Sequence, residues 1–504
     1  MTGIAAISVG RNAILSDISV LGRHIAMGYA TRVDATAFRA AARSVILAAR
    51  QAMGDLYLTL GDQPDRLVEM TRTVWSFTYE CPHCRSRFVY FECLSPDGRP
   101  PASCSVCPEP FVRRLWTRRD AIPVEVVFVG SNGRLVSRSV TDKDRTAIND
   151  AAHDPRVSLV PSLTIGTDRE MFRRSALNKD GLATTAGFFS DRNAIALYEL
   201  HRAILGVTDD EIRTKLLFAF TAILSRASRR YEWGPKRPLN ANNMIYRVAP
   251  VYYEWNVFDL YSRKIDAVIR ADREILASGT PGTFIYRTGS ASDLGHIDSG
   301  SIDYAFTDPP FGSNIFYSDM NLFQEAWLGE VTDNTVEAVV RTGRRRRHSE
   351  DRYEQILTRA FSEIHRVLKP GRYLSVVFGN SSGRNWDILH RSLQAAGFSN
   401  PPVHVAVLDK GQKSVKGQAS GIEAVTTVDL VITVRKDRQV PARPIMAAVV
   451  NPSELIEDVV ASFRGDLPDA SYVHAAVLAR AITSGMALNG LDLGAVKNAL
   501  GKVA

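Results

Sequence analysis

The chain has 504 residues, of which 45% are hydrophobic and 23% charged, a composition typical of a globular protein with several sizeable cores. Lysine and arginine outnumber aspartate and glutamate by 62 to 54, and the resulting net charge of +8 suits a polyanionic partner. An apolar run of roughly 18 residues is absent, as are the charged start and cleavage site of a signal peptide. The sequence therefore predicts a cytoplasmic protein without a membrane span.

The first fifty residues predict a helix, a strand and a second helix. Thr2–Ser8 begins with small apolar residues suited to a helix, and Gly10 is a stop signal. A short strand over Ala13–Leu15 then ends at Ser16 and Asp17. We expect these elements to belong to an α/β sheet that resumes much later in the chain.

All five cysteines lie between Cys81 and Cys107, which argues against a disulfide framework and for a metal. Two Cys-x2-Cys pairs, Cys81 with Cys84 and Cys104 with Cys107, are separated by 19 residues. Such knuckles close a tetrahedral site of four sulfur ligands, which predicts a structural zinc ion, with four free thiols as the alternative. Phe88–Glu92 is predicted to be a ribbon strand that includes no ligand, and Cys93 is assigned to a strand rather than to the metal.

Residues 121–280 begin with a predicted strand, Val124–Val129, and then become mostly helical. Leu197–Leu205 and Thr214–Ser225 have helical apolar spacing. Basic side chains surround Tyr231 and Trp233, and a second basic run follows about thirty residues after position 311. We predict phosphate contacts for both groups, with solvated loops as the alternative. The residues concerned are Arg230, Lys236 and Arg237 in the first group and Arg344, Arg345, Arg346 and Arg347 in the second.

Residues 281–437 alternate strands and helices, which predicts a parallel sheet. The predicted order is strand, polar turn, strand, helix, Pro-Gly turn and strand. Their ranges are Thr283–Arg287, Gly289–Leu294, Ser301–Phe306, Tyr353–Val367, Leu368–Gly371 and Tyr373–Phe378. Residues 438–504 follow a proline-containing link and are expected to form a small helical appendage.

The predicted strand Ser301–Phe306 runs directly into Asp308-Pro309-Pro310-Phe311. Two prolines cannot continue a central strand, so the chain must turn at the carboxyl end, where open α/β sheets bind ligands. An exocyclic amine on a nucleobase is a poor nucleophile because its lone pair is delocalised into the ring. The Asp308 carboxylate and the Pro309 carbonyl can accept hydrogen bonds from both of its N–H groups. Pro310 stiffens the turn, and Phe311 offers an aromatic face for an extruded base. The alternative is an ordinary turn at the end of a strand.

This tetrapeptide resembles the catalytic motif of amino-group DNA methyltransferases, and residues 365–381 resemble their following helix and strand. The chain is similar, over most of residues 1–437, to bacterial adenine-specific DNA methylases with an inserted zinc ribbon. The resemblance implies a Rossmann-like α/β sheet and methyl transfer from S-adenosylmethionine to adenine N6 or, less often, cytosine N4. Asp308 favours adenine, because cytosine enzymes usually begin the motif with serine. Cytosine C5 chemistry is disfavoured, since it needs a nucleophilic cysteine and none lies outside the cluster.

The resemblance also implies cofactor contacts. The family's glycine turn, Asp-Pro-Phe-x-Gly-Ser-Gly, commonly continues Met-Thr-Gly-Ile-Ala-Ala, and Met1–Ala6 matches that continuation. Thr2 and Gly3 are then cofactor residues, and Asp17 is the acid that binds the ribose hydroxyls. The chain is expected to begin inside this motif, with the first strand and the glycine turn upstream; the alternative is that Met1 starts an unrelated helix. Ser290 stands where many relatives place an aspartate that contacts the cofactor adenine, and Asp293 is a substitute.

Five domains are predicted on these grounds. They are residues 1–55 (N-terminal part of the methyltransferase domain), 70–120 (zinc ribbon), 121–280 (an insertion for target recognition), 281–437 (catalytic part) and 438–504 (helical appendage). The expected partner is double-stranded DNA, with a restriction or defence system as a further association. Two other functions stay open: a catalytically inactive DNA-binding remnant, and methylation of RNA or a protein amide.

Overall fold

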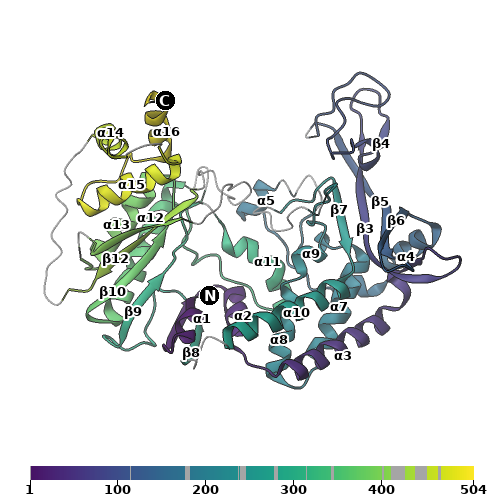
Figure 1. Cartoon of the computed structure of the whole chain (residues 1–504), viewed down its shortest axis with the longest axis horizontal. Helices are drawn as coiled ribbons and strands as arrows, with labels where there is room; N and C mark the ends of the chain where they lie inside the picture. Colours follow the sequence, from purple (N-terminus) through teal and green to yellow (C-terminus); the bar gives the residue numbers. More distant parts are fainter. Residues whose placement is uncertain are drawn as a thin grey trace.

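The computed structural model describes residues 2–113, 115–175, 177, 182–236, 238, 246–276, 282–313, 315–341, 346–399, 402–409, 426–437, 451–463 and 467–503. The protein has a mixed α/β fold. Figure 1 shows a sheet with its helices at one end, a helical region with long strands at the other, and α1, α2 and β8 between them. No helix in the described ranges combines the length and apolar character needed to cross a bilayer.

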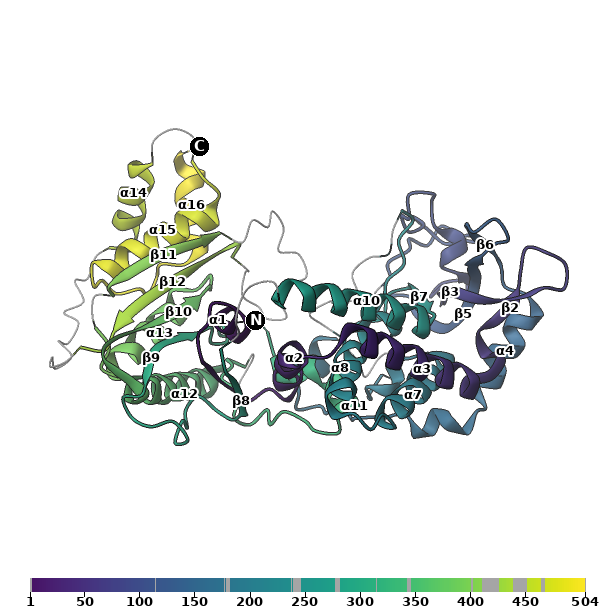
Figure 2. The ribbon, with the colours of Figure 1, turned by 60° about the horizontal axis from the view of Figure 1, so that its bottom comes forward.

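The sheet at one end has four strands in the order β11–β12–β10–β9. β9 runs parallel to β10, and β12 is antiparallel to both β10 and β11. The strands are β9 (Ile302–Thr307), β10 (Leu368–Phe378), β11 (His404–Asp409) and β12 (Val428–Arg435). Their helices are α12 (Arg346–Val367), α13 (Gly383–Ala395), α14 (Pro452–Ser462), α15 (Ala470–Thr483) and α16 (Leu493–Val503). In Figure 2, α12 lies beside β9 and β10, whereas α14, α15 and α16 lie beyond β11 and β12.

The predicted strand before Asp308 and the helix that ends at Val367 are confirmed, and the described residues beyond 450 form α14, α15 and α16. The predicted Pro-Gly turn at Leu368–Gly371 is wrong, because these residues lie inside β10. The pairing of β10 with β9 shifts in register between Leu368 and Tyr373, and Gly371 has a φ of +80°. Pro370 removes one ladder N–H, and the left-handed glycine lets the strand bulge and resume.

A separate pair of parallel strands joins β1 (Ala13–Asp17) to β8 (Phe284–Thr288). α1 (Thr2–Ser8) and α2 (Val20–Ala30) accompany this pair, as the sequence predicted for the first helix and strand. Its buried apolar cluster consists of Ile4, Ile7 and Ala13 among the described residues. Within the ranges that the structure describes, β1 pairs with β8 alone and β9 pairs with β10 alone.

The third sheet contains two long strands that form an arm (Figure 1). Its path is β2–β3–β5–β6, and β4 and β7 also pair with β3. The strands are β2 (Leu58–Leu60), β3 (Leu67–Glu80), β4 (Arg87–Val89), β5 (Thr117–Val129), β6 (Leu135–Ser139) and β7 (Val251–Trp255). The expected boundary between residues 120 and 121 falls inside β5, so the cysteine segment is the tip of this sheet. The predicted ribbon strand Phe88–Glu92 is shorter, because Phe91–Cys93 forms a 3-10 turn.

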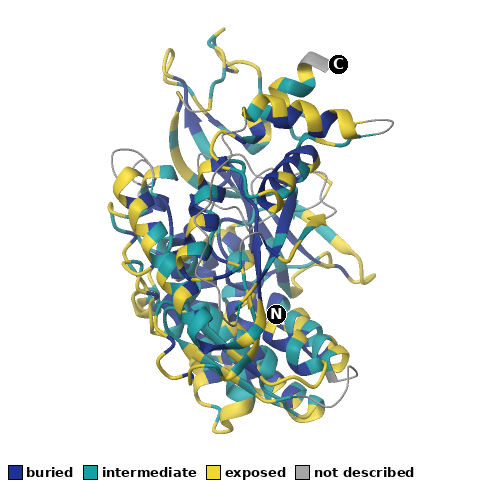
Figure 3. Ribbon diagram, turned by 90° about the vertical axis from the view of Figure 1, so that its left-hand side faces the viewer, coloured by how far each residue is buried: buried dark blue, intermediate teal, exposed yellow. Residues whose placement is uncertain are grey.

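The remaining helices form one large core together with the third sheet. They are α3 (Ala35–Met53), α4 (Asp142–Ala152), α5 (Glu170–Arg174), α7 (Asp191–Leu205), α8 (Asp210–Thr221), α9 (Leu224–Ala227), α10 (Val257–Leu276) and α11 (Tyr317–Leu328). Short 3-10 turns cover Gly54–Tyr57, Pro155–Leu159 and Ala186–Phe188. Although α3 precedes residue 55, its buried face packs with α7 in this core and not with the four-stranded sheet. Figure 3 shows buried strands at the centre and exposed positions on the outer helices.

Candidate active site

The turn after β9 is held by hydrogen bonds to its carbonyl groups. Tyr353 Oη donates to the Pro310 carbonyl at 2.6 Å, and Asn380 Nδ2 donates to the Phe311 carbonyl at 2.8 Å. Gly312 has a φ of +74°, and a Cβ there would lie 2.5 Å from Asn385 Nδ2, so only glycine fits this bend. The turn is therefore fixed in one conformation by side chains from α12 and from the residues after β10.

Within this turn the four predicted residues differ in exposure. Asp308 is exposed, Pro309 is buried, and Pro310 and Phe311 are half-buried. The Phe311 ring packs against Phe378 of β10, with ring centroids 5.1 Å apart and planes at 67°. The structure thus presents a carboxylate at the carboxyl end of a parallel strand, with an aromatic ring anchored beside it.

The second acidic strand end belongs to β1. The Ser19 backbone N–H donates to Asp17 Oδ1 at 2.9 Å, and Ser19 in turn caps α2 by accepting from the Gly22 N–H at 2.8 Å. Asp17 is exposed to water on one side, but the surrounding chain removes part of its hydration. This desolvation raises the pKa of Asp17, and the N–H groups of Ser19 and Ile18 oppose the shift.

Hydrogen bonds join α11 and the loop after it to the start of α2, which follows β1. Asn321 Nδ2 donates to Ser19 Oγ at 3.0 Å, and the Val20 N–H donates to Thr332 Oγ1 at 3.0 Å. The Leu21 N–H donates to Glu325 Oε1 at 3.3 Å. Because α11 begins nine residues after Asp308, these bonds tie the segment behind the turn directly to the first turn of α2, next to Asp17.

Tyr317, the first residue of α11, lies within electrostatic reach of both strand ends. Partial desolvation of its hydroxyl, together with the carboxylates of Asp308, Glu337 and Asp17, raises the pKa of Tyr317 to about 12. Glu337 is buried and accepts from the Ser318 N–H at 3.0 Å and from Ser318 Oγ at 2.6 Å. Asp17 and Asp308 thus both contribute to the raised pKa of this phenol. Sequence reasoning missed Tyr317, since an aromatic at a helix start carries no motif.

A cavity of about 450 Å³ opens at the carboxyl end of β1 and β8. It is lined by Ser16, Arg287, Thr288, Gly289, Ser290, Asp293, Gly295 and His296. Two residues predicted to contact a cofactor, Ser290 and Asp293, lie in this wall. Thr288 Oγ1 is buried there without a hydrogen-bond partner among the described residues. A buried polar atom without a partner is costly, so a ligand hydroxyl or ring nitrogen suits this position.

The turn that carries Ser290 and Asp293 is well ordered by local bonds. Ser290 Oγ accepts from the Ser292 N–H at 3.1 Å, and the Ser290 carbonyl accepts from the Asp293 N–H at 3.0 Å. Asp293 Oδ1 accepts from the Gly295 N–H at 3.1 Å. These bonds leave the Asp293 carboxylate exposed at the rim of the cavity.

Thr2 and Gly3 lie at the start of α1. Thr2 is exposed, whereas Gly3 is buried. A Cβ on Gly3 would lie 2.6 Å from the Phe284 ring and 2.8 Å from Leu15 Cδ1. Gly3 therefore allows α1 to pack closely on β1 and β8, which is the role that the third glycine has in Rossmann turns.

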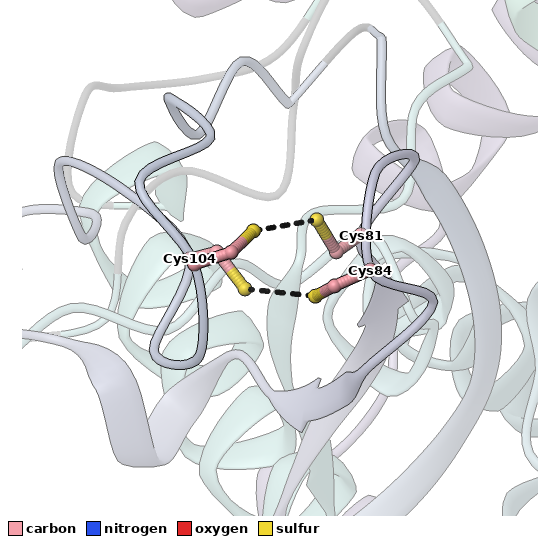
Figure 4. Close-up of side chains that lie close together, drawn as sticks. Cys81, Cys84 and Cys104 are labelled. Atoms are coloured by element: carbon pink, nitrogen blue, oxygen red, sulfur yellow. Dashed lines mark hydrogen bonds between the residues drawn. The ribbon is translucent and has the colours of Figure 1, made fainter.

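The four predicted metal ligands converge at the tip of the arm. Their sulfur atoms lie within 4.8 Å of one another, with Cys81 and Cys107 at 3.7 Å and Cys84 and Cys104 also at 3.7 Å. Figure 4 shows the two knuckles facing each other. A tetrahedron with Zn–S bonds of about 2.3 Å has edges of about 3.8 Å, so the arrangement fits a zinc ion with four sulfur ligands. Cys93 lies outside this group.

Aromatic rings form the core next to the knuckles. Tyr79, Phe88 and Phe111 have centroids 5.5 to 6.2 Å apart, and Trp116 lies 5.0 Å from Phe111. The Trp116 Nε1–H donates to the Pro110 carbonyl at 3.1 Å. The cysteine segment thus extends the large core to the end of β3 and β5.

The predicted basic residues fall in different environments. Arg230 is buried, and its guanidinium lies over the rings of Tyr246 and Phe323 at 5.1 and 5.6 Å. A phosphate cannot reach a side chain in this position, so the predicted surface contact of Arg230 is replaced by a packing role. Lys236 and Arg347 are exposed, and Arg346 and Arg347 belong to the first turn of α12 and not to a loop. Arg237, Arg344 and Arg345 lie outside the described residues.

No protein-family model matches the chain, and no curated protein matches it either. Three solved structures of a DNA modification methylase from Thermus thermophilus are similar to part of it: the selenomethionine derivative, the complex with S-adenosyl-L-methionine and the protein alone. Their sequence identities are 16 to 17%, and the matches cover 38% of this chain and 72% of the methylase. TM-scores of 0.17 to 0.20 are too low to carry an argument about this chain.

Proposed function

We propose that the chain transfers a methyl group from S-adenosylmethionine to the exocyclic amino group of a DNA base, with adenine N6 as the favoured acceptor. One observation carries the proposal. The Asp308–Phe311 turn at the carboxyl end of β9 is held rigidly by bonds from Tyr353 and Asn380, with the Asp308 carboxylate exposed.

In the half of the site that binds the base amine (the amine half), the exposed Asp308 carboxylate and the Pro309 carbonyl accept hydrogen bonds from the two N–H groups of the amine. The bonds that Tyr353 and Asn380 make to the next two carbonyls hold this acceptor pair in place. Holding both hydrogens moves the nitrogen towards tetrahedral geometry and frees its lone pair for attack. Phe311, anchored on Phe378, gives the extruded base a ring to contact.

In the cofactor half, the Asp17 carboxylate accepts from the ribose hydroxyls. Thr288, Ser290 and Asp293 line the cavity at the end of β1 and β8 and supply polar partners for the adenine end. When bound, S-adenosylmethionine supplies an electrophilic methyl group on a sulfonium. The residues of this chain orient the two reactants so that transfer proceeds in line.

Target recognition is proposed for residues 121–280, because this region reaches the helix behind the catalytic turn. Arg169 forms a 2.9 Å ion pair with Asp319 of α11, and Tyr246 Oη donates to the Asp319 carbonyl. Lys236 and Arg347 are the exposed predicted contacts to DNA phosphates. The slope of log affinity against log salt is negative for a DNA-binding protein. Replacing both residues with alanine should make this slope shallower by about two if each contacts a phosphate; an unchanged slope rejects the role.

The zinc ion is proposed to be held by Cys81, Cys84, Cys104 and Cys107 and to be structural, because four thiolates leave no open coordination position. A chelator should therefore unfold the tip of the arm while the four-stranded sheet keeps its amide protection. Loss of protection in both regions would contradict an independent, structural zinc site.

The decisive experiment is methyl transfer to double-stranded DNA, followed by mass spectrometry of the nucleosides. Asp308→Ala should lower the rate by at least about 100-fold. The matched control is Asp303→Ala on the same strand, where the carboxylate is exposed and pairs with Lys369 at 2.9 Å; this variant should keep its activity. N6-methyladenine is the expected product.

Other outcomes distinguish the alternatives. DNA binding by the wild-type chain without methyl transfer would favour a non-catalytic protein. Transfer to RNA or to a protein amide, with the same dependence on Asp308, would keep the chemistry and overturn the assignment of DNA as substrate. N4-methylcytosine would overturn only the preference for adenine.

A further inference from the structure

A second cavity lies between helices α2, α8, α10 and α11. Its volume is about 290 Å³, and α8 packs against both α2 and α10 beside it (Figure 2). It shares no lining residue with the cavity at the end of β1 and β8. The side chains that matter below are six of its lining residues: Ile25, Tyr29, Phe218, Lys264, Val268 and Gln324.

The helices around this cavity are fastened to one another by buried polar contacts. The Lys215 ammonium on α8 donates to the Gly28 carbonyl of α2 at 2.7 Å and pairs with Asp272 of α10 at 2.8 Å. The Leu21 N–H donates to Glu325 Oε1 at 3.3 Å, which joins α2 to α11. The walls of the cavity are therefore formed before a ligand arrives, which lowers the ordering cost of binding.

Much of the lining is apolar. Tyr29 and Phe218 meet edge to face, with ring centroids 4.8 Å apart and planes at 63°. A Cβ on Gly28 would lie 2.3 Å from Phe218 Cγ, so the Phe218 ring is pressed against α2. Val268 is buried, whereas Ile25 is 38% exposed. Two aromatic rings and two branched aliphatic side chains suit the apolar body of a small molecule.

Two polar side chains of the lining have no partner among the described residues. Gln324 Oε1 is buried without a hydrogen bond. Lys264 is half-buried, and its neighbours one turn away on α10 are apolar. Burial and the positive charge of Arg226 both lower the pKa of Lys264, and no carboxylate opposes this shift. An acceptor and a cation left in this state cost free energy, which a ligand with a donor and an anionic group would recover.

We propose that this cavity binds a small monocarboxylate with an apolar body and a hydroxyl group. The carboxylate pairs with Lys264, and the hydroxyl donates to Gln324 Oε1. The body lies against Ile25, Tyr29 and Phe218. The volume equals that of roughly ten water molecules at about 30 Å³ each, which sets the ligand at the size of 3-(4-hydroxyphenyl)propionate. This site is separate from the proposed function, and its test needs neither methyl donor nor DNA.

The test is calorimetry on the full chain with three probes: 3-(4-hydroxyphenyl)propionate, 3-phenylpropionate, which lacks the hydroxyl, and the neutral alcohol 3-(4-hydroxyphenyl)propanol. The first should bind with a dissociation constant below about 1 mM, and the alcohol should bind at least about tenfold more weakly. Saturable binding that is equal for the acid and the alcohol would overturn the inference, because the cation would then have no part in it.

Three variants locate the ligand. Lys264→Met should weaken both acids at least about tenfold. Gln324→Leu should weaken 3-(4-hydroxyphenyl)propionate about 3- to 10-fold and 3-phenylpropionate less than about twofold. Arg270→Met is the matched control, because Arg270 is an exposed cation on the same helix and is not part of the lining. It should change neither constant, and equal losses in Lys264→Met and Arg270→Met would show only a general effect of charge.

A thermal melt without ligand separates a binding residue from a structural one. The midpoint of Lys264→Met should stay level or rise, since the change removes a half-buried cation that has no acidic partner. A clearly lower midpoint would show that Lys264 stabilises the fold and would overturn the inference. The absence of saturable binding of either acid up to about 10 mM would also overturn it, and would leave the cavity to water or to a side chain of another protein.

Discussion

The ends of β9 and β1 form two halves of one proposed site, but different forces hold them. The turn after β9 is fixed by a large core around β10 and by hydrogen bonds from Tyr353 and Asn380. The end of β1 has a small cluster of Ile4, Ile7 and Ala13 beneath it. Asp17 at this end accepts from the Ser19 and Gly289 N–H groups, and bonds from α11 hold Ser19 and the start of α2. The comparison indicates that the amine half is preorganised by its own sheet, whereas the cofactor half depends on its neighbours.

The largest expected effect tests the packing beneath β1. Gly3→Ala places a Cβ 2.6 Å from the Phe284 ring and 2.8 Å from Leu15. Overpacking of this kind costs about 1 to 3 kcal/mol. Amide hydrogen exchange of Ala13–Asp17 should speed up accordingly, while that of Leu374–Phe378 in β10 stays unchanged.

The matched control for this variant is Gly494→Ala in α16, where a Cβ meets nothing within 4 Å. That change should be neutral or stabilising by up to about 1 kcal/mol, since alanine has the higher helix propensity. Equal acceleration of exchange in β1 and β10 by Gly3→Ala would show that the two halves unfold as one unit, which contradicts the comparison.

The second expected effect concerns the amine half. Tyr353→Phe removes the 2.6 Å bond to the Pro310 carbonyl and should cost about 1 to 2 kcal/mol, because a half-buried acceptor loses its donor. Methyl transfer at saturating cofactor should fall about tenfold as the acceptor pair loses its fixed aim. Affinity for S-adenosylmethionine should not change. Weaker cofactor binding with an unchanged transfer rate would place Tyr353 in the other half.

The features that sequence alone predicted are those set by local chemistry. Two prolines after a strand must make a turn, so the position of Asp308 at a sheet edge follows from Pro309 and Pro310 themselves. The spacing of the four cysteines likewise predicts a four-sulfur site without information from the rest of the chain. The same local reasoning located β1, β8 and β9, whose ends carry the candidate residues.

The features that sequence missed depend on distant neighbours. Arg230 resembles a surface cation in the sequence, but its guanidinium lies over the rings of Tyr246 and of Phe323, which is far away in the chain. Thr288, whose hydroxyl has no partner among the described residues, lies where β8 pairs with β1, and Ser16 and Gly289 meet there across a separation of 273 residues. The pKa of Tyr317 is raised by burial and by carboxylates on three other segments, those of Asp308, Glu337 and Asp17. Pro370 was predicted to lie in a turn, but β10 pairs with β9 at Leu368 and again from Tyr373, and Pro370 lies within the register shift between them.

The smallest expected effect tests the contact between the two halves. Asn321→Ala removes the 3.0 Å bond to Ser19 Oγ, which is partly exposed, so we expect a cost of about 0.5 to 1 kcal/mol. This cost should appear as a two- to fivefold weaker affinity for S-adenosylmethionine, because the bond positions the start of α2 beside Asp17. The transfer rate at saturation should hardly change, since the Asp308 turn keeps its own bonds.

A double-mutant cycle separates this bond from the cap that Ser19 provides. Ser19→Ala removes both the contact to Asn321 and the cap on the Gly22 N–H, and should cost about 1 kcal/mol more than Asn321→Ala. If the side chains act together, Asn321→Ala adds little further loss of affinity in a Ser19→Ala background. Full additivity of the two losses would show that the contact between α11 and α2 does not position Asp17, and that the cofactor half is held by β1 and β8 themselves.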